Sequence, residues 1–201
     1  MAETPIMLGR VLRAGTSSFV LGCNQYIAEQ EGFIPEFGGF VRADSMRGSP
    51  IYGLIYDVSV EDDDFVRQLV AAGIQDQTII EDHRRNRQVL VSVGVLILGY
   101  GRESGVVYLL PPQPPGTLKE IYACTSEEVA RVTAGHRWLR TVLTADDVPA
   151  EQLLAAALRR AAASRSPDQR ASYLVDAGRE LARLCLPDDL PVADAILRQL
   201  R

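Results

Sequence analysis

The first half of the chain, residues 7–111, consists of short apolar runs separated by glycine, proline and polar residues. The runs are rich in Val, Ile, Phe and Tyr, whose branched and aromatic side chains favour strands. This pattern is typical of a small antiparallel barrel. We expect strands at residues 7–13, 17–22, 39–44, 50–60, 87–100 and 104–110.

Glycines punctuate these predicted strands. Gly15-Thr16-Ser17 turns the first pair, and Arg102-Glu103-Ser104-Gly105 closes the last hairpin. Gly53 lies in the middle of the fourth predicted strand, where a glycine indicates a bulge or a tight barrel corner. The glycines within residues 94–101 lie inside a continuous apolar run, so we interpret them as sites where the strand coils.

Residues 61–86 form a predicted insertion between the fourth and fifth strands. It opens with the acidic run Glu61-Asp62-Asp63-Asp64, and four apolar residues follow within 65–70 at spacings of three and four. This spacing predicts one amphipathic helix with its carboxylates at the positive end of the helix dipole. Clustered carboxylates also suit a divalent metal. The run lacks the alternate spacing and distal glutamate of a calcium loop, so we favour a solvated helix start.

A proline-rich segment, residues 111–116, divides the chain. Pro111-Pro112-Gln113-Pro114-Pro115-Gly116 lacks most amide donors and favours extended polyproline geometry, so neither a strand nor a helix is expected to run through it. We interpret it as a linker, and a ligand for an aromatic groove on another protein is the alternative. The expected fold class is α+β: a small antiparallel β-barrel at 7–110, followed by an α-helical carboxy-terminal domain at 117–201.

The second half has the composition and the residue spacing of helices. Ala, Leu, Arg and Glu recur at helical spacing and predict four or five helices, the last from Val192 to Leu200. Thr125 and Glu128 fit a capping box, and Pro149 and Pro167 stand where helices can begin. Two apolar stripes are expected to pack against each other as a small bundle, without a cofactor pocket. They are Leu153, Leu154, Ala157, Leu158 and Ala161, and Tyr173, Leu174, Ala177, Leu181 and Leu184.

The composition is that of an ordinary globular protein. A hydrophobic fraction of 47%, a charged fraction of 23% and a net charge of −5 exclude a collagen, a coiled coil or a disordered tail. No apolar stretch approaches the ~20 residues of a membrane span, and residues 1–5 carry no export signal, so we expect a cytoplasmic protein. Cys23, Cys124 and Cys185 lie far apart, which argues against a disulfide framework or a structural zinc site.

The sequence carries no signature of catalysis. The only lysine, Lys119, is followed by Glu120, so no Walker-type phosphate loop is present. His83 lies among arginines and His136 begins a predicted helix beside Trp138, and we interpret both as solvated or capping residues. We therefore expect a protein that is not an enzyme and that uses no cofactor or metal. An enzyme whose site the sequence does not reveal is an alternative.

Arg84, Arg85 and Arg87 form the one concentrated basic run in the barrel half. Such a run can neutralise two or three phosphates of a nucleic acid. Residues 1–135, however, carry 17 acidic and 11 basic side chains and a charge of −6, unlike a protein that binds duplex DNA on its own. We expect contact with acidic protein partners, and direct DNA contact through Arg84, Arg85 and Arg87 is the alternative.

Four segments of the barrel half follow a family pattern: a strand started by glycine, a segment containing Ser-Phe, a strand preceded by glycine, and a strand interrupted by glycine. They are Leu8-Gly9-Arg10-Val11-Leu12, Ser17-Ser18-Phe19-Val20, Gly38-Gly39-Phe40-Val41-Arg42-Ala43 and Ile51-Tyr52-Gly53-Leu54-Ile55-Tyr56-Asp57-Val58. In this order they resemble the HAS barrel, which is shared by HerA-type DNA-translocating ATPases and the amino-terminal domains of rotary ATP synthase subunits. The resemblance covers residues 7–110, without the ATPase that follows the barrel in HerA-type proteins.

Residues 109–125 and the helices after them resemble the stand-alone HAS-barrel proteins of bacteria. The resemblance implies an accessory role beside a HerA-type ATPase and a NurA-type nuclease, which together process DNA ends, and it carries over no catalytic residue. Because a ring of such barrels forms a collar in the ATPases, a free barrel is expected to join or cap that collar. Candidate docking residues, expected to be exposed, are Phe33, Phe37, Arg47 and the helical face bearing Trp138. For Phe33 and Phe37 we favour the alternative, in which they fill the core. The partner and the oligomeric state stay open.

Overall fold

The computed structural model describes residues 5–24, 34–60, 90–185 and 190–199, together with positions 67, 71 and 73. Seven strands lie within these residues, and each of the six predicted strands is among them. The seventh was not predicted. The strands are β1 (Met7–Ala14), β2 (Ser18–Asn24), β3 (Phe40–Asp44), β4 (Pro50–Val60), β5 (Leu90–Arg102), β6 (Gly105–Val107) and β7 (Glu120–Ala123).

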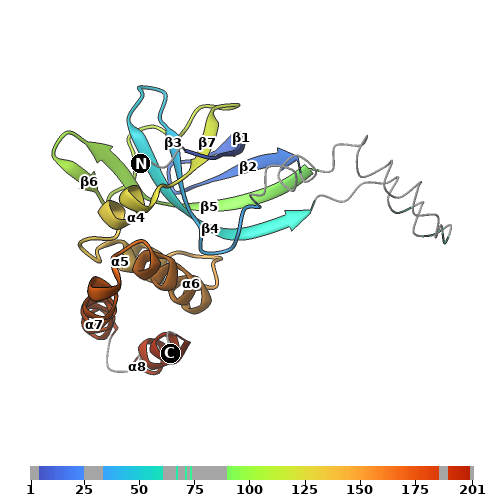
Figure 1. The fold of residues 1–201 in the computed structure, drawn as a ribbon. Coiled ribbons are helices and arrows are strands. Elements are labelled where there is room, and N and C mark those ends of the chain that lie inside the picture. The colour runs from blue at the N-terminus through green and yellow to red at the C-terminus, as the bar shows by residue number, and fades with distance from the viewer. Residues whose placement is uncertain are drawn as a thin grey trace.

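Six of these strands close into a barrel. Their order is β2-β1-β7-β3-β4-β5, and β5 pairs again with β2, so the ring is complete and every pair is antiparallel. β5 closes the ring because its 13 residues pair with β4 along one edge and with β2 along the other. β6 lies outside the ring, as a hairpin on the end of β5 (Figure 1). The α+β fold with an antiparallel barrel is confirmed.

The strand that completes the ring lies beyond the proline-rich segment. β7 pairs with β1 at residues 7–10 and with β3 at residues 41–43. Residues 111–116 contain neither a strand nor a helix, as predicted, but they return the chain to the barrel, and Pro115 forms an isolated bridge with Ser45. The barrel therefore extends to Ala123, past the expected start of the helical part at residue 117.

Two glycines permit close approaches that a side chain would block. β4 shifts its register against β5 at Gly53, which confirms the bulge, and a Cβ there would lie 2.4 Å from Val95 Cγ1. Gly38, just before β3, has a φ of +77°, and a Cβ there would lie 2.6 Å from the Cβ of Ala156. The second contact seats helix α6 (Ala150–Ala163) directly against the start of β3.

The barrel wall separates two apolar cores. Successive side chains of a strand point to opposite faces, so one set fills the interior while the other lies outside. On β5, for example, Val95 and Ile97 belong to the interior core, and Leu96 and Leu98 belong to the outer one. The interior core consists of Leu8, Val11, Phe19, Leu21, Cys23, Val41, Ala43, Ile51, Ile55, Val91, Val93, Val95, Ile97, Tyr100 and Ile121.

Five helices follow β7 in the described residues: α4 (Ser126–Val132), α5 (Trp138–Leu143), α6, α7 (Pro167–Leu184) and α8 (Leu190–Gln199). The capping box is confirmed, because Thr125 Oγ1 accepts the Glu128 N–H and Glu128 Oε2 accepts the Thr125 N–H at 3.0 Å. Pro149 directly precedes α6 and Pro167 is the first residue of α7, as predicted.

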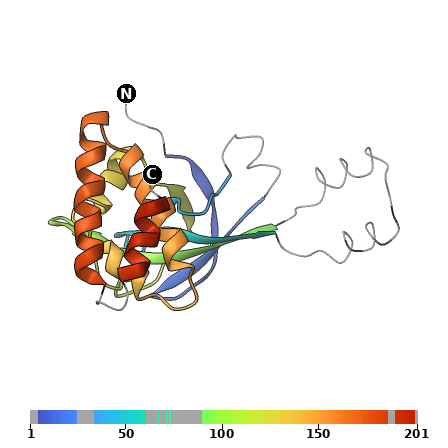
Figure 2. The ribbon, with the colours of Figure 1, turned by 90° about the horizontal axis from the view of Figure 1, so that it is seen from below.

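The helices and the outer face of β3, β4 and β5 share one apolar core. The predicted stripes of α6 and α7 meet in this core. α5 and α6 lie next to the barrel, and α7 and α8 form an outer layer (Figures 1 and 2). Trp138 is fully buried in the core, with its ring edge-on to Phe40 at a centroid distance of 5.8 Å. The expectation that the face bearing Trp138 is exposed for docking is therefore wrong, because that face packs on the barrel.

The last predicted strand is shorter than expected. β6 ends at Val107, where the prediction continued the strand to residue 110. Beyond Val107 the Tyr108 hydroxyl donates a hydrogen bond to the carbonyl of Val132 at the end of α4, at 2.8 Å. This bond ties the segment to the helices, and Leu109 and Leu110 follow it with exposed fractions of 69% and 55%.

The predicted insertion at 61–86 lies outside the described residues except for positions 67, 71 and 73. The amphipathic helix expected there stays a prediction. Among the helices that the structure describes, none combines the length and the apolar character needed to cross a membrane.

Candidate docking surfaces

A groove of about 820 Å³ runs between the segment after β6 and the helices α5 and α7. We call it the hairpin groove. Its walls come from three parts of the chain that are far apart in sequence but converge because the helical layer packs on β5. Its lining residues are Ile97, Leu98, Val106, Val107, Tyr108, Leu109, Leu110, Arg137, Arg140, Thr141, Thr144, Glu180, Arg183 and Leu184.

The groove has an apolar floor and an apolar lip. Leu98 contributes from the outer face of the barrel wall and is almost fully buried, while Leu109 and Leu110 are exposed. Tyr108 lies between these two sets and is held by its bond to Val132. Burial raises the pKa of the Tyr108 phenol, so the hydroxyl stays a neutral donor at physiological pH.

Basic side chains dominate the helical wall. Arg137, the N-cap residue of α5, and Arg140, in the last turn of α5, are exposed, and neither forms an ion pair with another described residue. The acidic lining residue, Glu180, accepts from Arg183 at 2.6 Å, and the hydrogen bonds from this guanidinium lower the pKa of the carboxyl. Two arginines that have no acidic partner in the described part of the chain therefore line the groove together with its apolar lip.

A stack of side chains fixes the turn that carries these arginines. His136 has a φ of +53°, and its ring stacks on Tyr173 of α7 at a centroid distance of 4.8 Å. The Arg165 guanidinium lies 3.6 Å from the centroid of the same Tyr173 ring and donates to Thr133 Oγ1 at 2.9 Å. Burial lowers the pKa of His136, so the imidazole is neutral at pH 7. His136 is thus a packing residue rather than a solvated one.

A second, smaller pocket of about 430 Å³ contains Arg47, one of the predicted docking residues. It lies where the turn after β3 meets the proline-rich segment, and Arg102 and Pro112 also line it. Arg102 is oriented by its bond to the Tyr100 hydroxyl at 2.8 Å. The described lining residues include two arginines and no carboxylate, so this pocket is positively charged.

A chain of polar side chains joins the barrel to the first helix. Arg42 of β3 donates to Glu128 Oε1 at 2.6 Å, while the other carboxylate oxygen completes the capping box. The exposed fractions of the two side chains are 27% and 10%. Arg42 also lies over the Tyr122 ring of β7. Glu128 therefore connects the barrel to the first helix after it.

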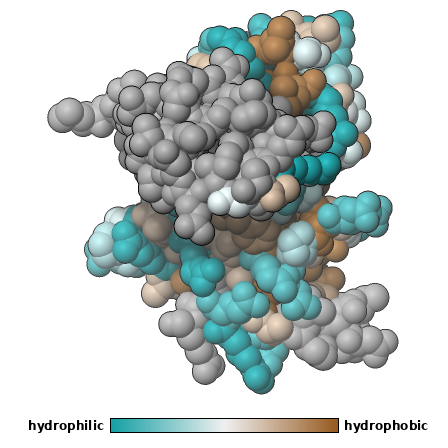
Figure 3. Space-filling view, turned by 90° about the vertical axis from the view of Figure 1, so that its right-hand side faces the viewer, coloured by the Kyte–Doolittle hydropathy of each residue, from teal (hydrophilic) through white to brown (hydrophobic). Residues whose placement is uncertain are grey.

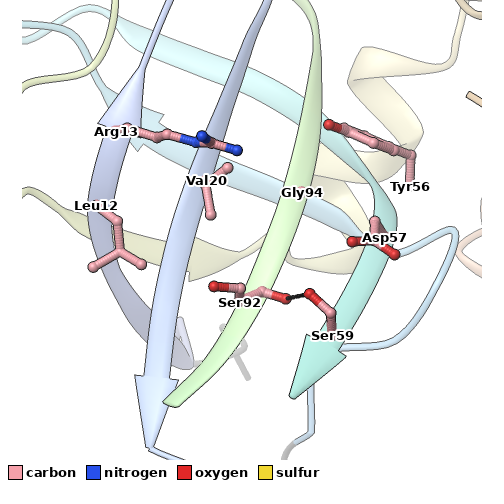
Figure 4. A pocket seen from close by; sticks show the side chains of 8 residues that line it. All are labelled: Leu12, Arg13, Val20, Tyr56, Asp57, Ser59, Ser92 and Gly94. Atoms are coloured by element: carbon pink, nitrogen blue, oxygen red, sulfur yellow. Dashed lines mark hydrogen bonds between the residues drawn. The ribbon is translucent and has the colours of Figure 1, made fainter. Parts of the chain in front are cut away.

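The barrel wall carries a third pocket, of about 410 Å³, on β1, β2, β4 and β5 (Figure 4). The Tyr56 ring lies across Gly94, where a Cβ would be 2.8 Å from the ring, and Ser59 donates to the Ser92 carbonyl at 3.3 Å. Arg13 and Asp57 line the pocket with opposite charges, so its charge favours no ligand class. On the side viewed in Figure 3, the coloured residues are mostly hydrophilic.

The structure places the sequence-predicted docking residues in different environments. Arg47 is exposed, Phe37 is partly buried against the core shared with the helices, and Trp138 is buried. Phe33 and the basic run at residues 84–87, with His83 before it, lie outside the described residues. The described part of the chain does not bring the predicted residues together into one surface.

No protein-family model and no curated protein matches this chain. Within the described residues, no group of three or more His, Cys, Asp or Glu side chains is arranged to hold a metal ion. The docking surfaces above therefore rest on the geometry of this chain alone.

Sequence reasoning missed Leu109, Leu110, Arg137 and Arg140. Leu109 and Leu110 fall within the strand predicted at residues 104–110, although the prolines that follow them mark a place where a strand must end. Arg137 precedes, and Arg140 belongs to, a helix of six residues, which is too short to show a periodic face. The one available signal was the pair of leucines directly before the proline-rich segment.

Proposed function

We propose that this protein is a non-enzymatic adaptor that docks on a HerA-type hexameric DNA translocase, or on its NurA-type nuclease, in the processing of DNA ends. The observation that carries the proposal is the closed barrel of the segment that resembles the HAS barrel. Residues 7–110 supply five of its six strands, β1 to β5. The sixth, β7, comes from beyond the resemblance and pairs with β1 and β3.

A closed barrel suits an adaptor for a physical reason. The ring pairs its strands with one another, so a partner is not recruited by adding a strand to the ring and must instead contact side chains. The helical layer covers the outer face of β3, β4 and β5 and creates the hairpin groove at its border. The protein therefore offers a rigid body with a distinct recess for a partner.

The test is co-elution with purified partners. The chain is mixed with the HerA-type ATPase and the NurA-type nuclease of the same genome, and the masses of the eluting species are measured by light scattering. We expect a complex of defined stoichiometry with one of the two proteins. Separate elution of all three proteins at micromolar concentrations would refute the proposal.

A DNA-binding measurement distinguishes the adaptor from the alternative, a nucleic-acid-binding barrel. Binding of labelled DNA to the chain alone is measured as the salt concentration rises, for the natural protein and for the Arg84→Ala/Arg85→Ala/Arg87→Ala variant. The adaptor proposal expects weak binding that the variant leaves unchanged. Tight binding that falls steeply with salt and is lost in the variant, without co-elution of a partner, would replace the adaptor by a nucleic-acid-binding barrel.

A further inference from the structure

The lip of the hairpin groove exposes two large apolar side chains on a segment that is held in place. Leu109 and Leu110 are 69% and 55% exposed, and the Tyr108 hydroxyl beside them is bonded to Val132 at 2.8 Å. Val106 and Leu184, which are partly exposed, continue the apolar surface into the groove. A contiguous apolar recess of this kind is typical of a site where another molecule is bound.

The charges around the recess restrict what can bind. Arg137 and Arg140 project from α5 without an acidic partner among the described residues, and the Glu180 carboxylate is occupied by Arg183. Arg137 stands at the amino-terminal cap of α5, where the helix dipole disfavours a cation, so the helix does not account for its presence. A ligand that brings carboxylates to this wall would be attracted by both arginines.

The apolar content of the groove distinguishes a peptide from a nucleic acid. On the barrel side, the side chains of Leu98 and Val106 belong to the outer core that borders the groove, and they offer no hydrogen bonds. A nucleic acid needs several cations along its backbone and aromatic faces for its bases. The aromatic lining residue Tyr108 is partly buried, and its hydroxyl is already bonded.

We propose that the hairpin groove binds an acidic segment of a partner protein. Large apolar side chains of that segment pack on Leu109 and Leu110, and its carboxylates pair with Arg137 and Arg140. The inference rests on the proposed function in that it specifies the chemistry by which the adaptor holds its partner. It does not depend on which protein the partner is.

The test uses random peptides displayed on phage and selected against the immobilised full-length protein. We expect the enriched peptides to combine Asp or Glu with Leu, Phe, Ile or Trp. A selected peptide, made synthetically and labelled, is expected to bind the Arg137→Glu/Arg140→Glu variant about tenfold more weakly or worse, and the Leu109→Ser/Leu110→Ser variant likewise. Arg179→Glu is the matched control, because Arg179 is an exposed arginine of α7 that does not line the groove, and binding should be unchanged.

Three results would overturn the inference. The first is the enrichment of basic or purely polar peptides, or of peptides that bind the Arg137→Glu/Arg140→Glu variant as well as the natural protein. The second is self-association, seen by sedimentation, that the same variant abolishes, since a second copy would then occupy the groove. The third is displacement of a selected peptide by single-stranded DNA. Unchanged circular dichroism and thermal unfolding of each variant ensure that a loss of binding reflects the groove.

The two proposals fail in different ways. If peptides bind the groove but neither the ATPase nor the nuclease co-elutes, the groove is supported as a peptide-binding site and the proposed function is refuted. Co-elution that the groove variants leave unchanged would support the adaptor and refute the groove as its docking site.

Discussion

Replacing Trp138 with alanine is expected to lower the free energy of unfolding by about 4 kcal/mol, as for other large aromatic residues removed from a core. Trp138 is fully buried between the barrel and the helical layer, and its ring contacts Phe40 edge-on at 5.8 Å. The substitution leaves a cavity at the interface between the barrel and the helical layer. Urea unfolding followed by far-UV circular dichroism measures the loss.

Two further variants serve as controls for Trp138→Ala. Trp138→Phe keeps an aromatic ring against Phe40 and should lose about half as much stability or less. Val175→Ala removes an apolar side chain that is 53% exposed and should change the free energy of unfolding by no more than about 0.5 kcal/mol. A loss below about 1 kcal/mol for Trp138→Ala would mean that the helices are not packed on the barrel.

Glu128→Ala is expected to cost about 3 kcal/mol, because one carboxylate performs two structural roles. One oxygen caps α4 by accepting the Thr125 N–H at 3.0 Å, and the other accepts from Arg42 of β3 at 2.6 Å. Removing the carboxylate opens the capping box and leaves a partly buried guanidinium without its counter-charge. Urea unfolding of the variant measures the loss in free energy.

The control lies one residue away. Glu127 occupies the same first turn of α4 but is exposed, so Glu127→Ala should change stability by a few tenths of a kcal/mol, about the value of a surface charge near a helix end. A double-mutant cycle with Arg42→Met isolates the coupling across the barrel and helix junction. Equal losses for Glu127→Ala and Glu128→Ala would contradict the assigned role of Glu128.

The local features of this fold were predictable because each depends on neighbouring residues. The strands follow apolar runs between breakers, Gly53 marks the bulge, and Thr125 with Glu128 marks the start of α4. Whether a segment forms a strand or caps a helix depends on residues within a few positions of one another, so the local sequence pattern predicts it. The same reasoning gave the apolar stripes of α6 and α7.

The features that were missed depend on distant contacts. β7 has four residues and follows a proline-rich segment, so its composition did not distinguish it from the helical half, yet it closes the ring between β1 and β3. Trp138 looked exposed because α5 is too short to show which face is buried. The hairpin groove combines residues near 108, 138 and 182, which only tertiary packing brings together.

Docking through the hairpin groove is tested by hydrogen exchange of the chain, with and without the HerA-type hexamer or the NurA-type nuclease that co-elutes with it. We expect slower exchange at residues 106–110 and 137–144 in the complex, and unchanged exchange in the barrel interior. Unchanged exchange at both groove segments, or protection confined to β1 and β2, would contradict docking through the hairpin groove.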